Sequence, residues 1–120
     1  MIDFQPGTIE AKFADIIWEN EPVSSAELAK KSEEIFKWKK TTTYTVLKRL
    51  CDKGIFQNNK GTVTSLISRQ DVYAVQSEKF VEQTFNGSLP AFFAAFSKRK
   101  KLSAAEVAEL RKMIDEYEEE

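Results

Sequence analysis

Hydroxyl and cationic side chains are interleaved in the segment "KKTTTYTVLKR", which covers residues 39 to 49. A threonine hydroxyl can donate to or accept from a base edge, its methyl can pack on a thymine methyl, and its shortness permits close approach. Lysine and arginine side chains bind phosphate oxygens. The segment therefore predicts recognition of a nucleic-acid duplex, and the alternative is that the threonines only cap and start a helix.

The basic residues are concentrated in the same region, although the net charge of the 120 residues is only −1. Residues 37–60 contain seven basic residues and one acidic residue, a local charge of +6. Residues 1–36 carry −5 and residues 61–120 carry −2. A positive patch on a nearly neutral protein is typical of a surface that binds phosphates, and the alternative is a solvated lysine-rich face.

Several kinds of catalytic and metal site cannot be assembled from these residues. The chain has no histidine and a single cysteine, Cys51, so one copy cannot form a Cys/His zinc site, a Ser-His-Asp triad or a Cys-His pair. No glycine-rich phosphate loop of the common types occurs in the sequence. We expect a protein that is not an enzyme and that has no metal and no cofactor.

The sequence also lacks the patterns of membrane insertion and export. No run of about 18 apolar residues is present, and the start "MIDFQPGTIE" has neither the basic nor the apolar region of a signal peptide. We expect the protein to be cytoplasmic, without membrane insertion.

Three short helices followed by a hairpin are predicted in the first part of the chain. Ser24 and Glu27 form the pattern of a capping box at the start of the second helix, and Gly54 suits the end of the third. The predicted helices span residues 9–19, 24–36 and 40–53, and the predicted strands span residues 55–59 and 62–67 around the turn "NKG". This order is that of a winged helix-turn-helix, in which the third helix enters the major groove.

A helical wheel of the third helix separates an apolar stripe from a polar face. The stripe consists of Thr43, Val46, Leu47 and Leu50, so we expect these side chains to be buried. Thr41, Thr45 and Lys48 lie on the opposite face, with Thr42 and Arg49 on one flank and Tyr44 on the other. The residues that we predict to contact DNA are Lys39, Lys40, Thr41, Thr42, Tyr44, Thr45, Lys48, Arg49 and Lys60.

The last third of the chain predicts helices with exposed apolar faces. We expect helices over residues 69–85 and 89–96, a solvated loop at 97–101, and a final helix capped by Ser103 and Glu106. In that helix apolar residues recur at the spacing of a helix–helix seam. We predict dimerisation through Phe92, Phe93, Phe96, Val107, Leu110, Ile114 and Tyr117. The alternative is that this surface packs on the winged domain of the same chain.

These residues resemble the penicillinase and methicillin-resistance repressor (BlaI/MecI) family. Trp18, the "ELA" of residues 27–29, Trp38 and the T-x-x-T-x-L-x-R-L run from Thr42 to Leu50 carry the resemblance, which continues through "LISRQDVY", "FNGSLPAFFAAF" and "LSAAEVAELRKMI". It implies a mainly α fold with a small β-hairpin, with a winged helix-turn-helix domain at 1–68 and a helical dimerisation region at 69–120. It also implies a cytosolic homodimer that binds a palindromic DNA operator and represses transcription.

The chain departs from the family pattern in two ways, and it also lacks a feature of one related branch. Residues 61–66 are about three residues shorter than the family's usual wing strand. Ala95 and Phe96 align with an Asn-Phe bond that a membrane-bound sensor protease cuts in some members, and because the asparagine is absent, proteolytic induction is not carried over. The tail "IDEYEEE" has no cysteine cluster of the kind found in copper-responsive relatives, which excludes metal induction by that route.

A second function remains open on the sequence alone. Winged helices also serve as protein–protein interaction modules without DNA binding, and in such a module the lysines would provide only solubility. Binding to a DNA duplex distinguishes the two hypotheses.

Overall fold

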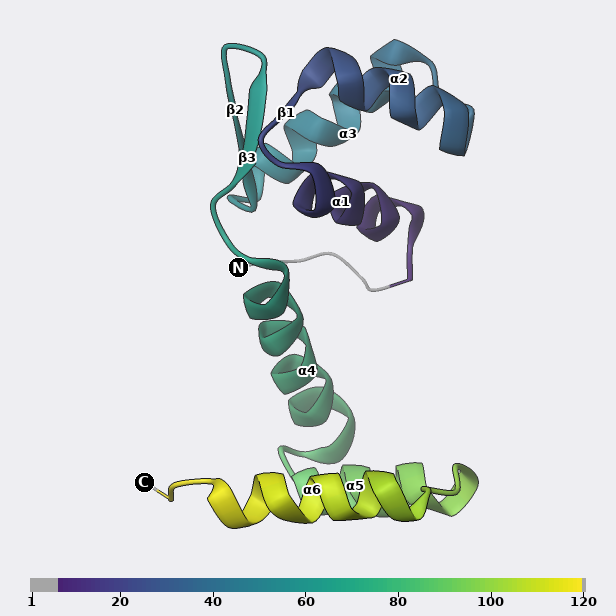
Figure 1. The fold of residues 1–120 in the computed structure, drawn as a ribbon, viewed down its shortest axis with the longest axis vertical. Helices are drawn as coiled ribbons and strands as arrows, with labels where there is room; N and C mark the ends of the chain where they lie inside the picture. Colours follow the sequence, from purple (N-terminus) through teal and green to yellow (C-terminus); the bar gives the residue numbers. More distant parts are fainter. Residues whose placement is uncertain (1–6, 120) are drawn as a thin grey trace. The chain divides into compact units, whose positions relative to one another are not determined.

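The computed structural model describes residues 7–119, which form a mainly α fold with a small antiparallel sheet (Figure 1). Its elements are α1 (Ile9–Asn20), β1 (Val23–Ser24), α2 (Ser25–Phe36), α3 (Lys40–Asp52), β2 (Phe56–Asn59), β3 (Thr62–Ser65), α4 (Arg69–Phe85), α5 (Leu89–Arg99) and α6 (Ala104–Glu116). The predicted helices and the hairpin are therefore confirmed. The chain divides into two compact units, Met1–Lys79 and Phe80–Glu120, and the domain boundary after residue 68 stays a prediction.

Local hydrogen bonds explain where the helices begin and end. Ser24 Oγ accepts from the backbone N–H of Glu27 at 3.0 Å. Only at Ser103 and Glu106 are both halves of a capping box present within the described residues. Gly54 follows α3 with φ +82, a left-handed conformation that glycine adopts without a Cβ clash. The caps read from the sequence thus fix the helix boundaries to within a few residues.

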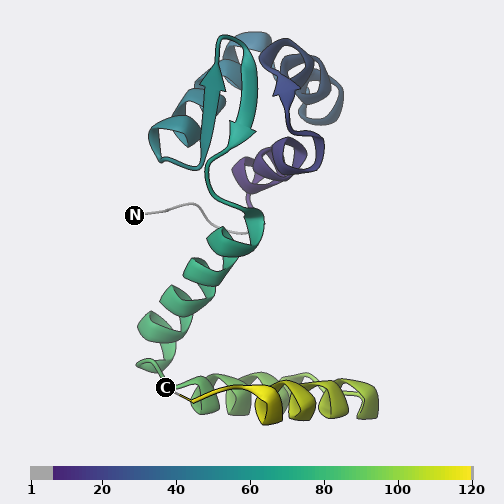
Figure 2. The same ribbon diagram turned by 60° about the vertical axis from the view of Figure 1, so that its left-hand side comes forward.

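The sheet contains a strand that the sequence did not predict. Its strand order is β1-β3-β2, with both pairings antiparallel (Figure 2). Strand β1 has two residues, and Val23 pairs with Val63. Two residues are too few to show an alternating pattern, so this strand is recognisable only once β3 lies beside it.

The core of the first unit lies between α1, α2, α3 and the sheet. The largest fully buried side chains include Phe13, Ile17, Leu28, Leu50 and Phe56. The predicted stripe of α3 is confirmed, because Thr43, Val46, Leu47 and Leu50 are all buried. Helical periodicity predicts that Leu28, Ser32, Ile35 and Phe36 line one face of α2, and for burial of Ile35 this prediction is wrong, since its side chain is 58% exposed.

Two buried hydroxyl groups weaken this core. Ser32 and Thr43 are both fully buried, and neither hydroxyl oxygen has a hydrogen-bond partner among residues 7–119. A buried polar group without a partner costs about 1–3 kcal/mol. We expect Thr43→Val, which keeps the shape and removes the hydroxyl, to raise the free energy of unfolding by about 1 kcal/mol. Urea denaturation of the full chain at fixed protein concentration measures it.

The exposed Thr41 provides the matched control for this prediction. Thr41→Val makes the same chemical change on the same helix, and a surface change of this kind shifts stability by about 0.5 kcal/mol at most. A Thr43→Val variant no more stable than Thr41→Val would show that the buried hydroxyl is satisfied.

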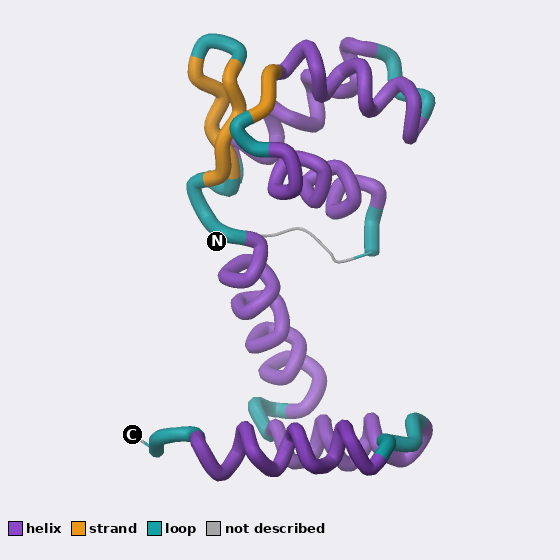
Figure 3. Tube along the Cα trace, in the orientation of Figure 1, coloured by secondary structure: helices purple, strands orange, loops and turns teal. Residues whose placement is uncertain are grey.

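The second unit consists of the end of α4, α5 and α6, and it is poorly buried. Helices α5 and α6 run side by side in opposite directions (Figures 1 and 3). Neither contains a buried residue. Rings of Phe80, Phe85, Phe92 and Phe96 cluster with centroids 5.6–6.0 Å apart. Such a unit keeps much of its apolar surface in contact with solvent.

Two expectations for this unit are corrected. Residues 97–99, expected in a loop, belong to α5, where Lys98 and Arg99 in the last turn interact favourably with the helix dipole. Tyr117 lies beyond the end of α6, with extended backbone angles, so it does not continue the helical spacing of Val107, Leu110 and Ile114. Within residues 7–119 no helix is long and apolar enough to span a bilayer.

Candidate nucleic-acid interface

The polar face of α3 is open to solvent in the first unit. Thr41, Thr42, Thr45, Lys48 and Arg49 are exposed, and Tyr44 is partly exposed. The N-cap of α3 is Lys39, and no side-chain hydrogen bond caps the helix. The threonines therefore do not cap the helix, and Thr41 and Thr42 lie in its first turn as short polar side chains on the outer surface. That they serve only to begin the helix stays an alternative.

The threonine hydroxyls on this face differ in what they can offer a ligand. Thr45 Oγ1 donates to the backbone carbonyl of Thr41 at 2.9 Å, so its oxygen is left mainly as an acceptor. The Thr42 hydroxyl has no hydrogen-bond partner within the described part of the chain. Thr42 can therefore present both a donor and an acceptor, while Thr45 presents an acceptor and a methyl group.

The seven cations of residues 37–60 divide into paired and unpaired groups. Arg49 and Lys53 share the carboxylate of Glu10, at 3.2 and 2.9 Å. Lys48 lies 3.1 Å from Asp52, one turn along the same helix. Lys40 lies over the Tyr44 ring, 5.8 Å from its centroid, which leaves its charge uncompensated.

No ion pair within residues 7–119 involves the other three, Lys37, Lys39 and Lys60. Sequence reasoning missed Glu10, because a residue 39 positions before Arg49 gives no local signal of the contact. It also left Lys37 out of the site, although this residue ends α2 in a left-handed conformation with an exposed side chain.

The hairpin between β2 and β3 presents a cation in a strained conformation. Lys60 and Gly61 have φ values of +53° and +91°, the pattern of a type I′ turn. The Asn58 side chain accepts from the Gly61 N–H at 2.9 Å and braces the turn. Left-handed backbone costs a non-glycine residue about 1–2 kcal/mol, so the turn holds Lys60 at the tip of the hairpin at some cost in stability.

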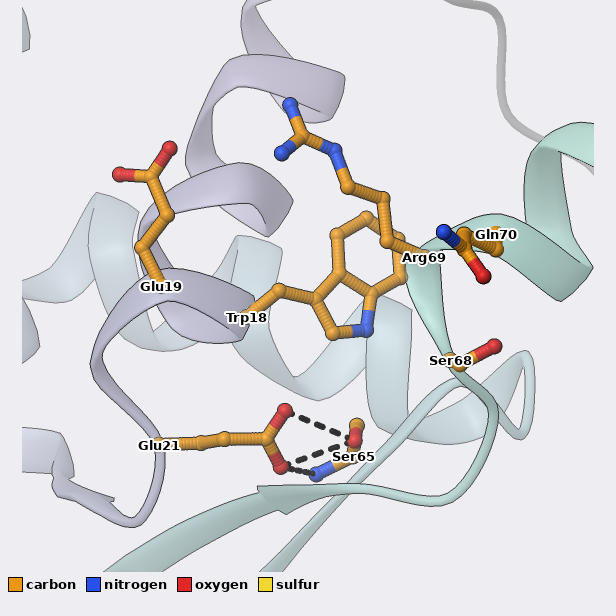
Figure 4. Close-up of a pocket in the computed structure, with 7 residues that line it drawn as sticks. All are labelled: Trp18, Glu19, Glu21, Ser65, Ser68, Arg69 and Gln70. Atoms are coloured by element: carbon orange, nitrogen blue, oxygen red, sulfur yellow. Dashed lines mark hydrogen bonds between the residues drawn. The ribbon is translucent and has the colours of Figure 1, made fainter.

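A pocket of about 310 Å³ lies away from α3, where α1, β3 and α4 meet (Figure 4). The Glu21 carboxylate accepts from the backbone N–H and the hydroxyl of Ser65, both at 2.8 Å. Trp18 Nε1 donates to the carbonyl of Ile67 at 3.1 Å. These bonds attach the hairpin to α1. None of the residues that we predicted to contact DNA lines this pocket.

Cys51, the single cysteine, lies on α3 and is half-buried. Burial raises the pKa of its thiol, the Asp52 carboxylate adds to this effect, and Lys48 opposes it. The protonated thiol is a poor nucleophile and a poor metal ligand. No group of three or more His, Cys, Asp or Glu residues that could hold a metal ion occurs in residues 7–119.

Comparison with known proteins gives a consistent family relationship. The family model for the penicillinase repressor matches residues 6–116. The penicillinase repressor of Bacillus licheniformis is 29% identical over 112 residues, covering 90% of this chain and 88% of the relative. The methicillin resistance regulatory protein MecI of Staphylococcus aureus is 23% identical over 116 residues, covering 93% of this chain and 94% of the relative.

The family match extends over both units, from the start of α1 to the end of α6. It confirms the resemblance drawn from the residues around α3, and with it the expectation that the chain is not an enzyme. The protein therefore belongs to the penicillinase repressor (BlaI/MecI) family of transcriptional repressors.

Proposed function

We propose that this protein represses transcription as a homodimer that binds a palindromic DNA operator, with α3 of each copy in one of two successive major grooves. Recognition helices in such dimers lie roughly 34–36 Å apart, one turn of the duplex. The compartment in which we propose that it works is the cytoplasm, where it meets the operator DNA.

The observation that carries this proposal is the exposed polar face of α3. On the opposite face, Leu47 and Leu50 are buried in the core, and this packing holds the helix in place. Thr41, Thr42 and Thr45 remain exposed to solvent. A rigid helix that exposes short hydrogen-bonding side chains at its N-terminal end suits base readout in the major groove.

The side chains of this face divide into two roles in our proposal. Thr42, Thr45 and Tyr44 contact base edges or the neighbouring sugar-phosphate. Lys39 and Lys40 contact phosphates at the N-terminus of α3, where the helix dipole adds to their attraction. The remaining phosphate contacts come from Lys48, Arg49 and Lys60.

The exposed apolar side chains of the second unit support the dimer. Leu89, Phe93, Phe96, Met113 and Ile114 are 45–72% exposed. An apolar surface of this kind marks an interaction site in a protein that does not aggregate. A second copy that covers this surface would give α5 and α6 the buried core that one copy lacks.

The role of Thr42 provides the test of this proposal. If its hydroxyl reads a base, we expect Thr42→Ala to lose about 1–3 kcal/mol of affinity for the cognate operator and much less for random duplex. The cognate sequence comes from selection of bound fragments out of random DNA at physiological salt, and fluorescence anisotropy then measures both affinities.

Thr62→Ala is the matched control, because Thr62 is an exposed threonine of β3 outside α3. Equal losses on cognate and random DNA for Thr42→Ala would remove the base contact. Failure of the unmodified protein to bind any duplex would favour the protein–protein interaction module instead.

A separate prediction concerns the strained turn at Lys60. Asparagine tolerates the left-handed conformation, and Asn-Gly is a preferred type I′ pair, so we expect Lys60→Asn to raise the free energy of unfolding by about 0.5–1 kcal/mol. The same change removes one phosphate contact per copy and should reduce the salt dependence of DNA binding by about one counterion for each copy. Urea denaturation and a salt titration measure the two effects.

Lys60→Gln distinguishes the charge of Lys60 from its backbone strain. It should weaken DNA binding as much as Lys60→Asn does, without the gain in stability. If both variants bind DNA as tightly as the unmodified protein, the hairpin does not contact the duplex.

A further inference from the structure

The two ends of the α5–α6 hairpin carry opposite charge. Lys98 and Arg99 form the last turn of α5, and Lys100 and Lys101 follow it. At the other end, α6 closes with Asp115 and Glu116, and Glu118 and Glu119 come directly after it. We call these the basic end and the acidic end.

The two ends cannot neutralise each other within one chain. The two ends lie at opposite termini of α6, which has 13 residues and a length of about 20 Å. This separation exceeds the screening length of about 8 Å at physiological salt. Figures 1 and 3 show the connection between α5 and α6 at one end of this hairpin and the C-terminal residues at the other. No ion pair within residues 7–119 involves any of the eight side chains.

The acidic end is the less favourable of the two. Negative side chains at the C-terminus of a helix repel its dipole, and the last turn of α6 contains no basic residue to offset this. At the basic end, the cations at the C-terminus of α5 interact favourably with the dipole of that helix. Arg111 and Lys112 lie one turn before Asp115 and Glu116, but no ion pair joins them within residues 7–119, and Glu118 and Glu119 lie beyond the helix. A cationic group of a second copy would therefore stabilise the acidic end.

An exposed apolar strip joins the two ends. Along α6, Leu110, Met113 and Ile114 are 36%, 62% and 72% exposed. A strip with a basic group at one end and an acidic group at the other is complementary to a second copy of itself turned by 180°. In a parallel arrangement the same strips would bring like charges together.

We propose that the basic and acidic ends select an antiparallel arrangement of α6 in the dimer, with the basic end of each copy against the acidic end of the other. This inference rests on the homodimer of the proposed function. An arrangement centred on Leu110 sets Lys101 against Glu119 of the second copy, and Glu109 against Arg111 of the second copy. The apolar strip supplies the affinity, and the charged ends determine orientation and partner choice.

Charge reversal tests this arrangement in the full chain. One variant carries K98E, R99E, K100E and K101E, and the other carries D115K, E116K, E118K and E119K. Each variant alone would place like charges at both ends of the dimer, so we expect its dimer dissociation constant to rise at least tenfold at low salt. Mixing the unmodified chain with a chain that carries all eight reversals separates the two arrangements. Antiparallel pairing should give homodimers in large excess over heterodimers and parallel pairing the reverse, and native mass spectrometry counts both.

Two control variants show whether a change in dimerisation arises from the arrangement of the charges or from misfolding or altered net charge. A variant with all eight reversals again matches basic to acidic ends and should dimerise within about threefold of the unmodified chain, which shows that the substitutions permit folding. Reversing four lysines of the first unit makes the same change in net charge as the first variant and should leave dimerisation nearly unchanged. These control positions are Lys12, Lys30, Lys31 and Lys37.

The outcomes distinguish the register from the dimer itself. An excess of heterodimers between the unmodified and eight-reversal chains, or a statistical mixture of the two chains, would overturn the antiparallel arrangement and leave the proposed function intact, provided that the unmodified protein is dimeric. A monomeric unmodified protein at micromolar concentration, measured by sedimentation, would overturn both.

Discussion

Raising the monovalent salt concentration from about 50 to about 200 mM should weaken operator binding by about a thousandfold. Of the residues predicted to contact DNA, Lys39, Lys40 and Lys60 lack a carboxylate partner within the described residues, so a dimer presents six such cations. Each phosphate neutralised releases nearly one counterion, so the slope of log affinity against log salt should be about −5. Anisotropy titrations at four or five salt concentrations give this slope.

The cations that form ion pairs within the chain should contribute less to the salt dependence of DNA binding than their number suggests. Arg49 and Lys53 already share Glu10, and Lys48 lies on Asp52, so a phosphate must compete with an existing carboxylate for each of them. Glu10→Gln removes the shared carboxylate and should steepen the slope. The combined change of Lys39, Lys40 and Lys60 to glutamine should flatten it, while Lys12→Gln with Lys30→Gln, two exposed lysines outside the site, should not. An affinity independent of salt would remove the basic patch from the mechanism.

The second large effect is expected at the apolar strip of α6. Ile114 is 72% exposed in one copy, and in the dimer we expect it to lie in the covered interface. A buried carboxylate there would have no partner, and a central interface residue is worth at least about 2–4 kcal/mol. Ile114→Asp should therefore raise the dimer dissociation constant by about 100-fold or more, which analytical ultracentrifugation measures.

Operator binding should fall with dimerisation, because one α3 reads only half of a palindrome. Ala108→Asp is the matched control: it places the same charge on the same helix, on the side facing away from Leu110 and Ile114. We expect this variant to remain dimeric and to bind the operator. If Ile114→Asp stays dimeric, the strip is not the interface, and the apolar surface must be covered in another way.

The elements that were predicted correctly depend on contacts between residues close in sequence. The first residues of α1 and α4 follow from the side-chain caps of Thr8 and Ser68, and the last residue of α3 follows from Gly54. These signals act within four residues of the helix terminus. The buried stripe of α3 follows from its 3.6-residue periodicity. Ile35 shows where this reasoning fails. Periodicity tells which side of a helix a residue lies on, but it does not tell how far the neighbouring elements extend to cover that side.

The sequence by itself determined the order of helices and hairpin, the family, the polar face of α3 and the concentration of cations beside it. Only the tertiary structure decided which of those cations are paired, because Glu10 reaches Arg49 and Lys53 across 39 and 43 residues of chain. It likewise decided that β1 joins the sheet and that Glu21 holds Ser65. The physical reason is range: caps and periodicity act within a few residues, whereas ion pairs and strand pairing depend on how distant segments meet after folding.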